Sequence, residues 1–165
     1  MTGSEVVVDD TSGRHSSEAQ PAEAHPSGAV SGVSEAHRQV PPPPAFTMRQ
    51  LDRIDEALTM ASRETELYFT LYIGALDVPT RGHAERLHAQ LGSLAPISVL
   101  IAVSPGQRVL EIVTGDDSAI RIPDRSCAIA AASMTASFGS GDLTGGIVNG
   151  LRILSDQARH PRLRR

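Results

Sequence analysis

Apolar positions change their spacing along the chain, and each change marks an expected element. Between residues 47 and 64, apolar residues recur at helical spacing, namely Leu51, Ile54, Leu58 and Ala61. Thr47 and Gln50 form a capping-box pattern at the start of this segment, so Thr47 is the expected cap. From Leu67 to Ile73 the period changes to two, which predicts a strand after the first helix.

A second helix and a hairpin are expected next. Thr80 stands where it can cap a helix over residues 81–94, which carries an apolar stripe. Residues 97–104 form a near-continuous apolar run, as a strand covered on both faces would. The letters "PGQR" then supply a tight turn into a second strand over residues 109–115. The short segment 119–122 predicts a further edge strand that ends before a proline.

Two more helices complete the pattern. Asp124 is the expected cap of a helix over residues 125–138, and Asp142 is the expected cap of one over 143–158. The predicted fold class is therefore α/β, with a mixed sheet of about four strands flanked by about four helices.

The first part of the chain lacks such periodicity. Residues 1–45 are rich in Ser, Gly, Ala, Glu and Pro and end in four prolines, which predicts a disordered acidic arm. The proline run favours a stiff spacer, with a ligand for a proline-binding groove as the alternative. We place the folded domain at residues 46–160 and a basic tail at residues 161–165.

Composition narrows the classes of function. The chain has 165 residues, enough for one domain, and its net charge of -4 comes mainly from the arm. A nearly neutral body with 3% aromatic residues argues against nucleic-acid binding. All 15 basic residues are arginine, which excludes Schiff-base chemistry and a phosphate-loop lysine. A single cysteine and the lack of a signal or membrane-spanning segment predict a soluble cytoplasmic protein.

The glycine-rich stretch "SFGSGDLTGGIVNG" raises the question of a phosphate cradle. Its spacing fits neither a dinucleotide fingerprint nor a Walker loop, and the carboxylate of Asp142 would repel a phosphate at the helix start. We assign Gly139 and Gly141 to the turn, in conformations with positive φ. Gly146 and Gly150 lie one helical turn apart and are expected to let the two last helices pack closely.

The order of elements, together with "VLIAVSPGQRVLEIVTG", "IPDRSCA" and "FGSGDLTGGIVNGLRIL", resembles the TPM family, the phosphatase-like domain of thylakoid lumen proteins. The chain is most similar to an actinobacterial domain of unknown function related to that family. The resemblance spans about two thirds of the chain. It implies a mixed sheet flanked by helices, with divalent-cation binding or phosphomonoester hydrolysis in some members. By matching motif positions, Asp124 and Asp142 are the aspartates that the resemblance implies. Family members often have an Asp-Asn-Gly turn where "APIS" stands here, so one expected carboxylate is missing.

Three aspartates are the candidate metal ligands. Asp116 and Asp117 follow the second hairpin strand, and Asp124 precedes the next helix, so their carboxylates would suit Ca²⁺ or Mg²⁺ if these chain segments converge. The alternative, which we favour, is that Asp124 and Asp142 are caps and that the Asp116–Asp117 pair is a solvated turn.

Three other side chains have reactive chemistry. His83 and His88 lie five residues apart on one helix and point in different directions, so they are poor joint metal ligands. His83 is either a general base or an exposed helix residue, and we favour the latter. Cys127 is either a thiol activated by a helix N-terminus or a buried small residue, and its place in the apolar stripe favours burial.

These observations lead to a preferred hypothesis and two alternatives. The preferred one is a non-catalytic cytoplasmic module that acts through a protein partner. The second is a weak divalent-metal-dependent acid phosphatase that uses Asp116, Asp117 and Asp124. The third is a homo-oligomer packed through the last two helices.

Overall fold

A computed structural model describes residues 4–8 and 46–160, and for Ser4–Val8 it describes the strand without its side chains. Four strands form one sheet in sequence order, namely β1 (Ser4–Val8), β2 (Tyr68–Ile73), β3 (Ser98–Ser104) and β4 (Val109–Thr114). The first three strands are parallel to one another, and β4 is antiparallel to β3. The predicted mixed sheet and its hairpin are thus confirmed.

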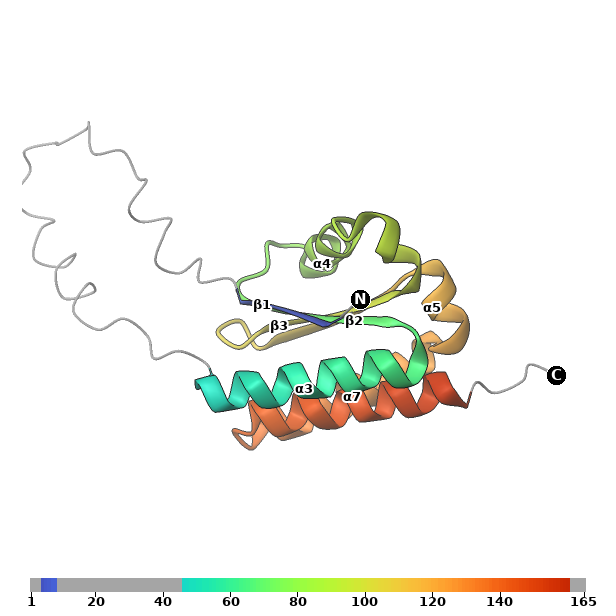
Figure 1. Ribbon diagram of the computed structural model, residues 1–165. Helices are drawn as coiled ribbons and strands as arrows, with labels where there is room; N and C mark the ends of the chain where they lie inside the picture. Colours follow the sequence, from blue (N-terminus) through green and yellow to red (C-terminus); the bar gives the residue numbers. More distant parts are fainter. Residues whose placement is uncertain (1–3, 9–45, 161–165) are drawn as a thin grey trace, which may run out of the picture. The chain divides into compact units, whose positions relative to one another are not determined.

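Helices cover both faces of this sheet (Figure 1). The helical segments are α3 (Met48–Thr65), α4 (Thr80–Ala89), the 3-10 helix η1 (Gly92–Ile97), α5 (Asp116–Arg121), α6 (Asp124–Gly139) and α7 (Leu143–Arg159). The larger core lies between the sheet and α3, α6 and α7, and a smaller one lies beneath α4. Within the described part of the chain, no helix is long and apolar enough to span a membrane.

Alternation along the strands explains this three-layer arrangement. On β2, Phe69 and Leu71 are fully buried in the larger core, whereas Tyr72 belongs to the smaller one. On β3, Ile101 faces the larger core and Leu100 the smaller. Because successive strand residues point to opposite faces, one uninterrupted apolar run supplies both cores.

The first strand comes from a segment for which the sequence predicts no structure. Ser4–Val8 pairs with β2 in register from Ser4 opposite Phe69 to Val8 opposite Ile73. Its three consecutive valines are β-branched residues that suit a strand. Residues 9–45 and 161–165 lie outside the described residues, so the disorder, the polyproline spacer and the basic tail remain predictions.

The prediction of an edge strand at residues 119–122 is wrong. Residues 119–121 form the end of α5, and Ile122 is the C-cap of that helix. Gly115 is the N-cap of this helix, and an added Cβ there would overlap the backbone carbonyl of Ala95. The helix leaves the side chain of Ile120 78% exposed, whereas Ile122 is fully buried. A strand would place these two side chains on one face, so the helix buries Ile122 without burying Ile120.

The prediction that Thr47 is an N-cap is confirmed, and the prediction that Thr80 is one is wrong. The Gln50 amide donates to Thr47 Oγ1 at 3.3 Å, and the Thr47 amide donates to Gln50 Oε1 at 2.8 Å. Thr80 is instead the first residue of α4, after the N-cap Pro79. Its hydroxyl donates to Glu111 on β4 at 2.9 Å, which ties α4 to the edge of the sheet.

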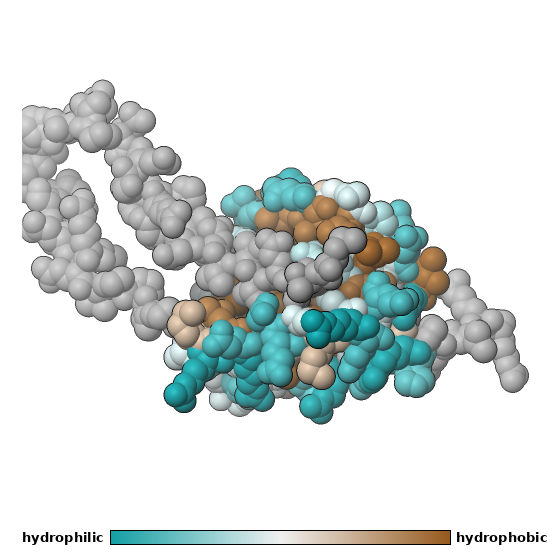
Figure 2. Space-filling view, in the orientation of Figure 1, coloured by the Kyte–Doolittle hydropathy of each residue, from teal (hydrophilic) through white to brown (hydrophobic). Residues whose placement is uncertain are grey.

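The outer face of α3 is hydrophilic. Figure 2 shows hydrophilic residues gathered where α3 runs in Figure 1. The exposed charged residues of this helix are Arg49, Asp52, Arg53, Asp55, Glu56, Arg63 and Glu64. Mixed charges of this kind keep the outer face of the helix solvated while its opposite face packs on the core.

Candidate functional site

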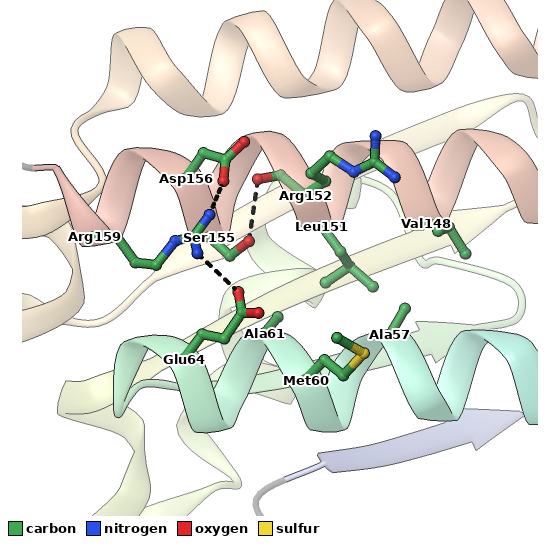
Figure 3. Close-up of a pocket in the computed structure, with 10 residues that line it drawn as sticks. All are labelled: Ala57, Met60, Ala61, Glu64, Val148, Leu151, Arg152, Ser155, Asp156 and Arg159. Atoms are coloured by element: carbon green, nitrogen blue, oxygen red, sulfur yellow. Dashed lines mark hydrogen bonds and ion pairs between the residues drawn. The ribbon is translucent and has the colours of Figure 1, made fainter.

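A surface groove of about 280 Å³ lies between α3 and α7. Its lining comes from these two helices, as Figure 3 shows. The residues are Ala57, Met60, Ala61, Glu64, Val148, Leu151, Arg152, Ser155, Asp156 and Arg159. We refer to this depression as the α3–α7 groove.

Small and aliphatic side chains make the bottom of the groove. Ala57 and Ala61 are one helical turn apart on α3, and Leu151 of α7 is 1% exposed. Because alanine fills so little of the space between two helices, a depression remains there. The side chain of Met60 stands beside it and is 53% exposed. The groove therefore offers an apolar bottom and a flexible, polarizable wall.

Charged residues edge the groove at its end near the helix C-termini. Arg159 forms an ion pair with Glu64 of α3 at 3.4 Å and also pairs with Asp156 (Figure 3). Arg152 is exposed, and its guanidinium forms no ion pair or hydrogen bond with the described residues. A cation without a partner in the described part of the chain thus stands beside an apolar depression, where it would favour a ligand with a carboxylate.

The three candidate metal ligands lie at the starts of two helices. Asp116 and Asp117 are exposed in the first turn of α5, and Asp124 is exposed in the first turn of α6. In the described ranges, no group of three or more His, Cys, Asp or Glu residues is arranged to hold a metal ion. The described structure does not assemble the expected carboxylate cluster.

The expected capping role of Asp124 is also wrong. Pro123 is the N-cap of α6, without a side-chain capping bond, and Asp124 is the first helical residue. The pair Asp116–Asp117 is likewise helical and not a solvated turn. At such positions a carboxylate stabilises the helix through its dipole, without accepting the capping hydrogen bond.

The glycine-rich stretch is a capped turn between α6 and α7. Asp142 is the N-cap of α7, and its Oδ1 accepts from the Gly145 amide at 2.8 Å, as expected. Gly141 has φ 86°, which confirms one of the two expected positive values. Gly139 is the last residue of α6 and is not in the left-handed region, so the other expectation is wrong.

Close packing of α6 on α7 follows from two glycines. A Cβ on Gly146 would lie 2.7 Å from the ring of Phe138, and one on Gly150 would overlap the side chain of Met134. Both glycines are buried, and Met134 is fully buried. The predicted packing role of Gly146 and Gly150 is confirmed.

Cys127 is a half-buried thiol without activation. Its pKa is raised to about 11, mainly because burial disfavours the thiolate and also because the Asp124 carboxylate lies nearby, whereas Arg81 acts to lower it. The side chain packs at the edge of the larger core. A thiol with this pKa is almost entirely protonated at neutral pH, so it is a poor nucleophile.

The two histidines have different surroundings. His83 is half-buried, and its Nδ1 accepts a hydrogen bond from the Asp77 amide at 2.7 Å. His88 is only 8% exposed, and its Nε2 lies 3.4 Å from the Ser98 carbonyl. The expectation of an exposed His83 is therefore wrong. An occupied Nδ1 also places the ring proton on Nε2, which leaves the neutral ring without a free basic nitrogen.

The fold defines this protein as an α/β protein with a four-stranded mixed sheet between two helical layers. Within that class, the chain belongs to the family described as "Domain of unknown function (DUF5130)", whose model matches residues 10–155. The match includes residues 10–45, which precede α3.

Two mycobacterial proteins are similar in sequence. They are the "Uncharacterized protein Rv2468c" and the "Uncharacterized protein MT2543" of two Mycobacterium tuberculosis strains. Each is 31% identical to this chain over 129 residues, which cover 78% of this chain and 76% of the relative.

Solved structures show the same fold at low sequence identity. The N-terminal domain of a P. gingivalis protein has a TM-score of 0.60 at 20% identity, over 69% of this chain and 76% of that one. The BA42 protein of Bizionia argentinensis has a TM-score of 0.59 at 16% identity, over 68% and 81%. The N-terminal domain of the cg2496 protein of Corynebacterium glutamicum has a TM-score of 0.58 at 11% identity, over 68% and 74%.

Sequence reasoning missed the groove. The helical stripe of α3 indicates which side of that helix is apolar, and Ala61 is part of it. No local pattern indicates that α7 lies beside α3, or that Met60 and Arg152 come from two helices to edge one depression. The one available signal is the pair of small residues, Ala57 and Ala61, one turn apart on an otherwise bulky helix.

Proposed function

We propose that this DUF5130 protein is a non-catalytic module that binds a protein partner in the α3–α7 groove. The observation that carries the proposal is the exposed guanidinium of Arg152, which has no partner among the described residues, beside an apolar depression. Recognition sites on proteins combine apolar surface with a few polar groups that orient the ligand. The partner segment would place an aliphatic side chain over Ala57 and Ala61 and a carboxylate against Arg152.

The groove has properties that favour a protein segment as its ligand. It is an open depression between two helices, and flexible methionines are common at surfaces that accept varied side chains. Grooves of this kind accept short helices or extended segments. Of the reactive side chains considered above, the Cys127 thiol is protonated and the Nδ1 of His83 is bound by the backbone.

Two further parts of the proposal concern class and location. We propose that the fold is TPM-like, which the order of α3, β2, α4, the β3–β4 hairpin, α6 and α7 supports. We also propose that the protein acts in the cytoplasm, which its single, free cysteine supports because a reducing compartment favours free thiols.

A photo-crosslinking amino acid at position 60 tests the function. Ile129 on α6 is the matched control, because its side chain is also 53% exposed. We expect a discrete protein adduct from position 60 in cells and none of the same mass from position 129. Equal adducts from the two positions, or none from position 60, would refute binding in the groove.

Charge reversal at Arg152 makes the test specific. Arg152→Glu should abolish the adduct, whereas Arg125→Glu on the exposed surface of α6 should leave it unchanged. An adduct of twice the chain mass would identify the partner as a second copy and make the protein a homo-oligomer. An adduct that survives Arg152→Glu would contradict the assigned role of the guanidinium.

A further inference from the structure

The loop from Gly74 to Pro79 is held at defined points after β2. The Tyr72 hydroxyl donates to the Ala75 carbonyl at 2.8 Å. Leu76 is 2% exposed, and the side-chain amide of Gln107 binds both its N–H, at 2.7 Å, and its carbonyl, at 2.8 Å. The first half of the loop is thus fixed to the sheet and to the β3–β4 hairpin.

The second half of the loop depends on a histidine. The Asp77 amide donates to His83 Nδ1 at 2.7 Å, and the Asp77 carboxylate Oδ2 lies 3.6 Å from the same nitrogen. A neutral imidazole has one donor and one acceptor nitrogen, so this bond requires the proton to be on Nε2. The same nitrogen therefore faces a donor and, slightly farther away, a strong acceptor.

We propose that protonation of His83 switches the loop between two arrangements. A solvent proton that binds the ring goes to Nδ1, which then becomes a donor and can no longer accept from the Asp77 amide. The Asp77 carboxylate is close enough to take the new N–H with a small movement. A neutral contact to the backbone is replaced by an ion pair to the side chain of the same residue.

The change would be confined to Asp77 and Val78. Leu76 stays bound to Gln107, and the Pro79 carbonyl accepts from the His83 amide at 3.2 Å in the first turn of α4. Between these two fixed points stands Val78, whose side chain is 87% exposed. Protonation therefore alters how an exposed aliphatic side chain and a carboxylate are presented to solvent.

The surroundings of His83 support an acceptor role for Asp77. From β2, the Tyr72 ring lies 6.2 Å from the imidazole, and its hydroxyl is already bound to Ala75. The hairpin residue that reaches this loop, Gln107, carries no charge. On α4 itself, the cation Arg86 lies three residues along, with its guanidinium beside Gly82. Of the groups that these contacts place around the ring, the Asp77 carboxylate is the anionic one.

Nuclear magnetic resonance of the full-length chain between pH 8 and pH 5 tests the switch, because histidines exchange protons in that range. At pH 8 we expect a proton on His83 Nε2 and a strongly downfield amide proton at Asp77. As His83 titrates, the Asp77 and Val78 amides should shift in step with its ring, while titration of the exposed His160 leaves them unchanged.

Two variants separate the roles. His83→Gln keeps an acceptor that does not titrate, so the Asp77 amide should lose its pH dependence. Asp77→Asn removes the anion and should leave the hydrogen bond from the residue 77 amide to His83 Nδ1 intact at pH 8. A His83 ring protonated on Nδ1 at pH 8, or amides of Asp77 and Val78 that ignore the His83 titration, would overturn the proposal. If His83→Gln does not fold, the wild-type titration alone decides.

Discussion

Arg121 connects the ends of two helices through one side chain. Its Nε and Nη2 donate to the Ala158 carbonyl at 3.1 and 2.8 Å, and its Nη1 donates to the Thr65 carbonyl. Thr65 ends α3, and Ala158 lies in the last turn of α7. Carbonyls at helix C-termini lack partners within the helix, and a cation there is also attracted by the partial negative charge of the helix dipole. One guanidinium therefore stabilises both helix ends.

Arg121→Met should lower the free energy of unfolding by about 2–3 kcal/mol, because charged hydrogen bonds to two carbonyls are lost while the aliphatic packing stays. Arg125→Met, at an exposed position of α6, should change it by no more than about 0.5 kcal/mol. Urea denaturation of the two variants measures the difference. Equal effects would show that Arg121 is not a structural residue.

Cys127 should be slow to alkylate in the folded protein. With a pKa of about 11, only about 0.1% of the thiol is ionised at pH 8. Iodoacetamide should therefore react much more slowly with the native chain than with the chain in urea. Similar rates in the two states would contradict the partial burial and the raised pKa of this thiol.

The raised pKa of Cys127 also links its ionisation to stability. Because the pKa of this thiol rises from 9.0 in the unfolded chain to about 11 in the fold, the folded state favours the protonated form. Its contribution is complete below pH 9 and is lost as the pH rises toward 11. The loss of stability over this range should be smaller in Cys127→Ala.

At the scale of elements, α6 and α7 approach closely because Gly150 leaves room for Met134. Gly150→Ala should destabilise the protein by about 1–3 kcal/mol, since the added methyl group overpacks a buried contact. Gly139→Ala is the control, because a Cβ there has open space at the end of α6, and it should be neutral or slightly stabilising.

A double variant identifies the cause of that loss. Met134→Ala removes the side chain that the new methyl group would overlap, so Gly150→Ala should cost less in the Met134→Ala background than in the wild type. Thermal denaturation of the four proteins gives the coupling energy. A purely additive result would mean that Gly150 acts through helix propensity or backbone freedom and not through this contact.

Elements with strong periodicity were predictable, and short ones were not. A regular pattern runs for six residues or more in α3, β2 and β3, and in each case it predicts the type of element. The pattern is a helical stripe in α3, alternation in β2 and a continuous apolar run in β3. The six residues of α5 are too few to show a helical period, and "AIRI" alternates as an edge strand would. The helix forms because burial of Ile122 and the contacts of Arg121 outweigh the local pattern.

For the whole molecule, β1 covers the edge of β2. Deletion of residues 1–8 should lower the stability and speed amide exchange at Tyr68–Ile73, because these residues would lose their parallel partner. Amides of β4, on the other edge of the sheet, serve as the internal control. Unchanged exchange in β2 would show that β1 contributes little to the fold.

The three candidate carboxylates should not act as one cation site. Asp116, Asp117 and Asp124 begin two different helices, and the described residues contain no metal-holding group of three. Titration with Ca²⁺ or Mg²⁺ should therefore give no saturable shifts at their amides. Shifts that saturate together at the three residues, and vanish in Asp124→Asn, would restore the metal-dependent alternative.

The sequence by itself determined the α/β class, the main helices, the hairpin, the caps at Thr47 and Asp142 and the close packing at Gly146 and Gly150. These features depend on residues near one another in the chain, where periodicity and capping act. Only the tertiary structure decided the pairing of β1, the helical α5, the α3–α7 groove and the contact between Asp77 and His83. The first three depend on which distant segments share a neighbour, and the last on how the loop after β2 folds back against α4, and no local pattern carries that information.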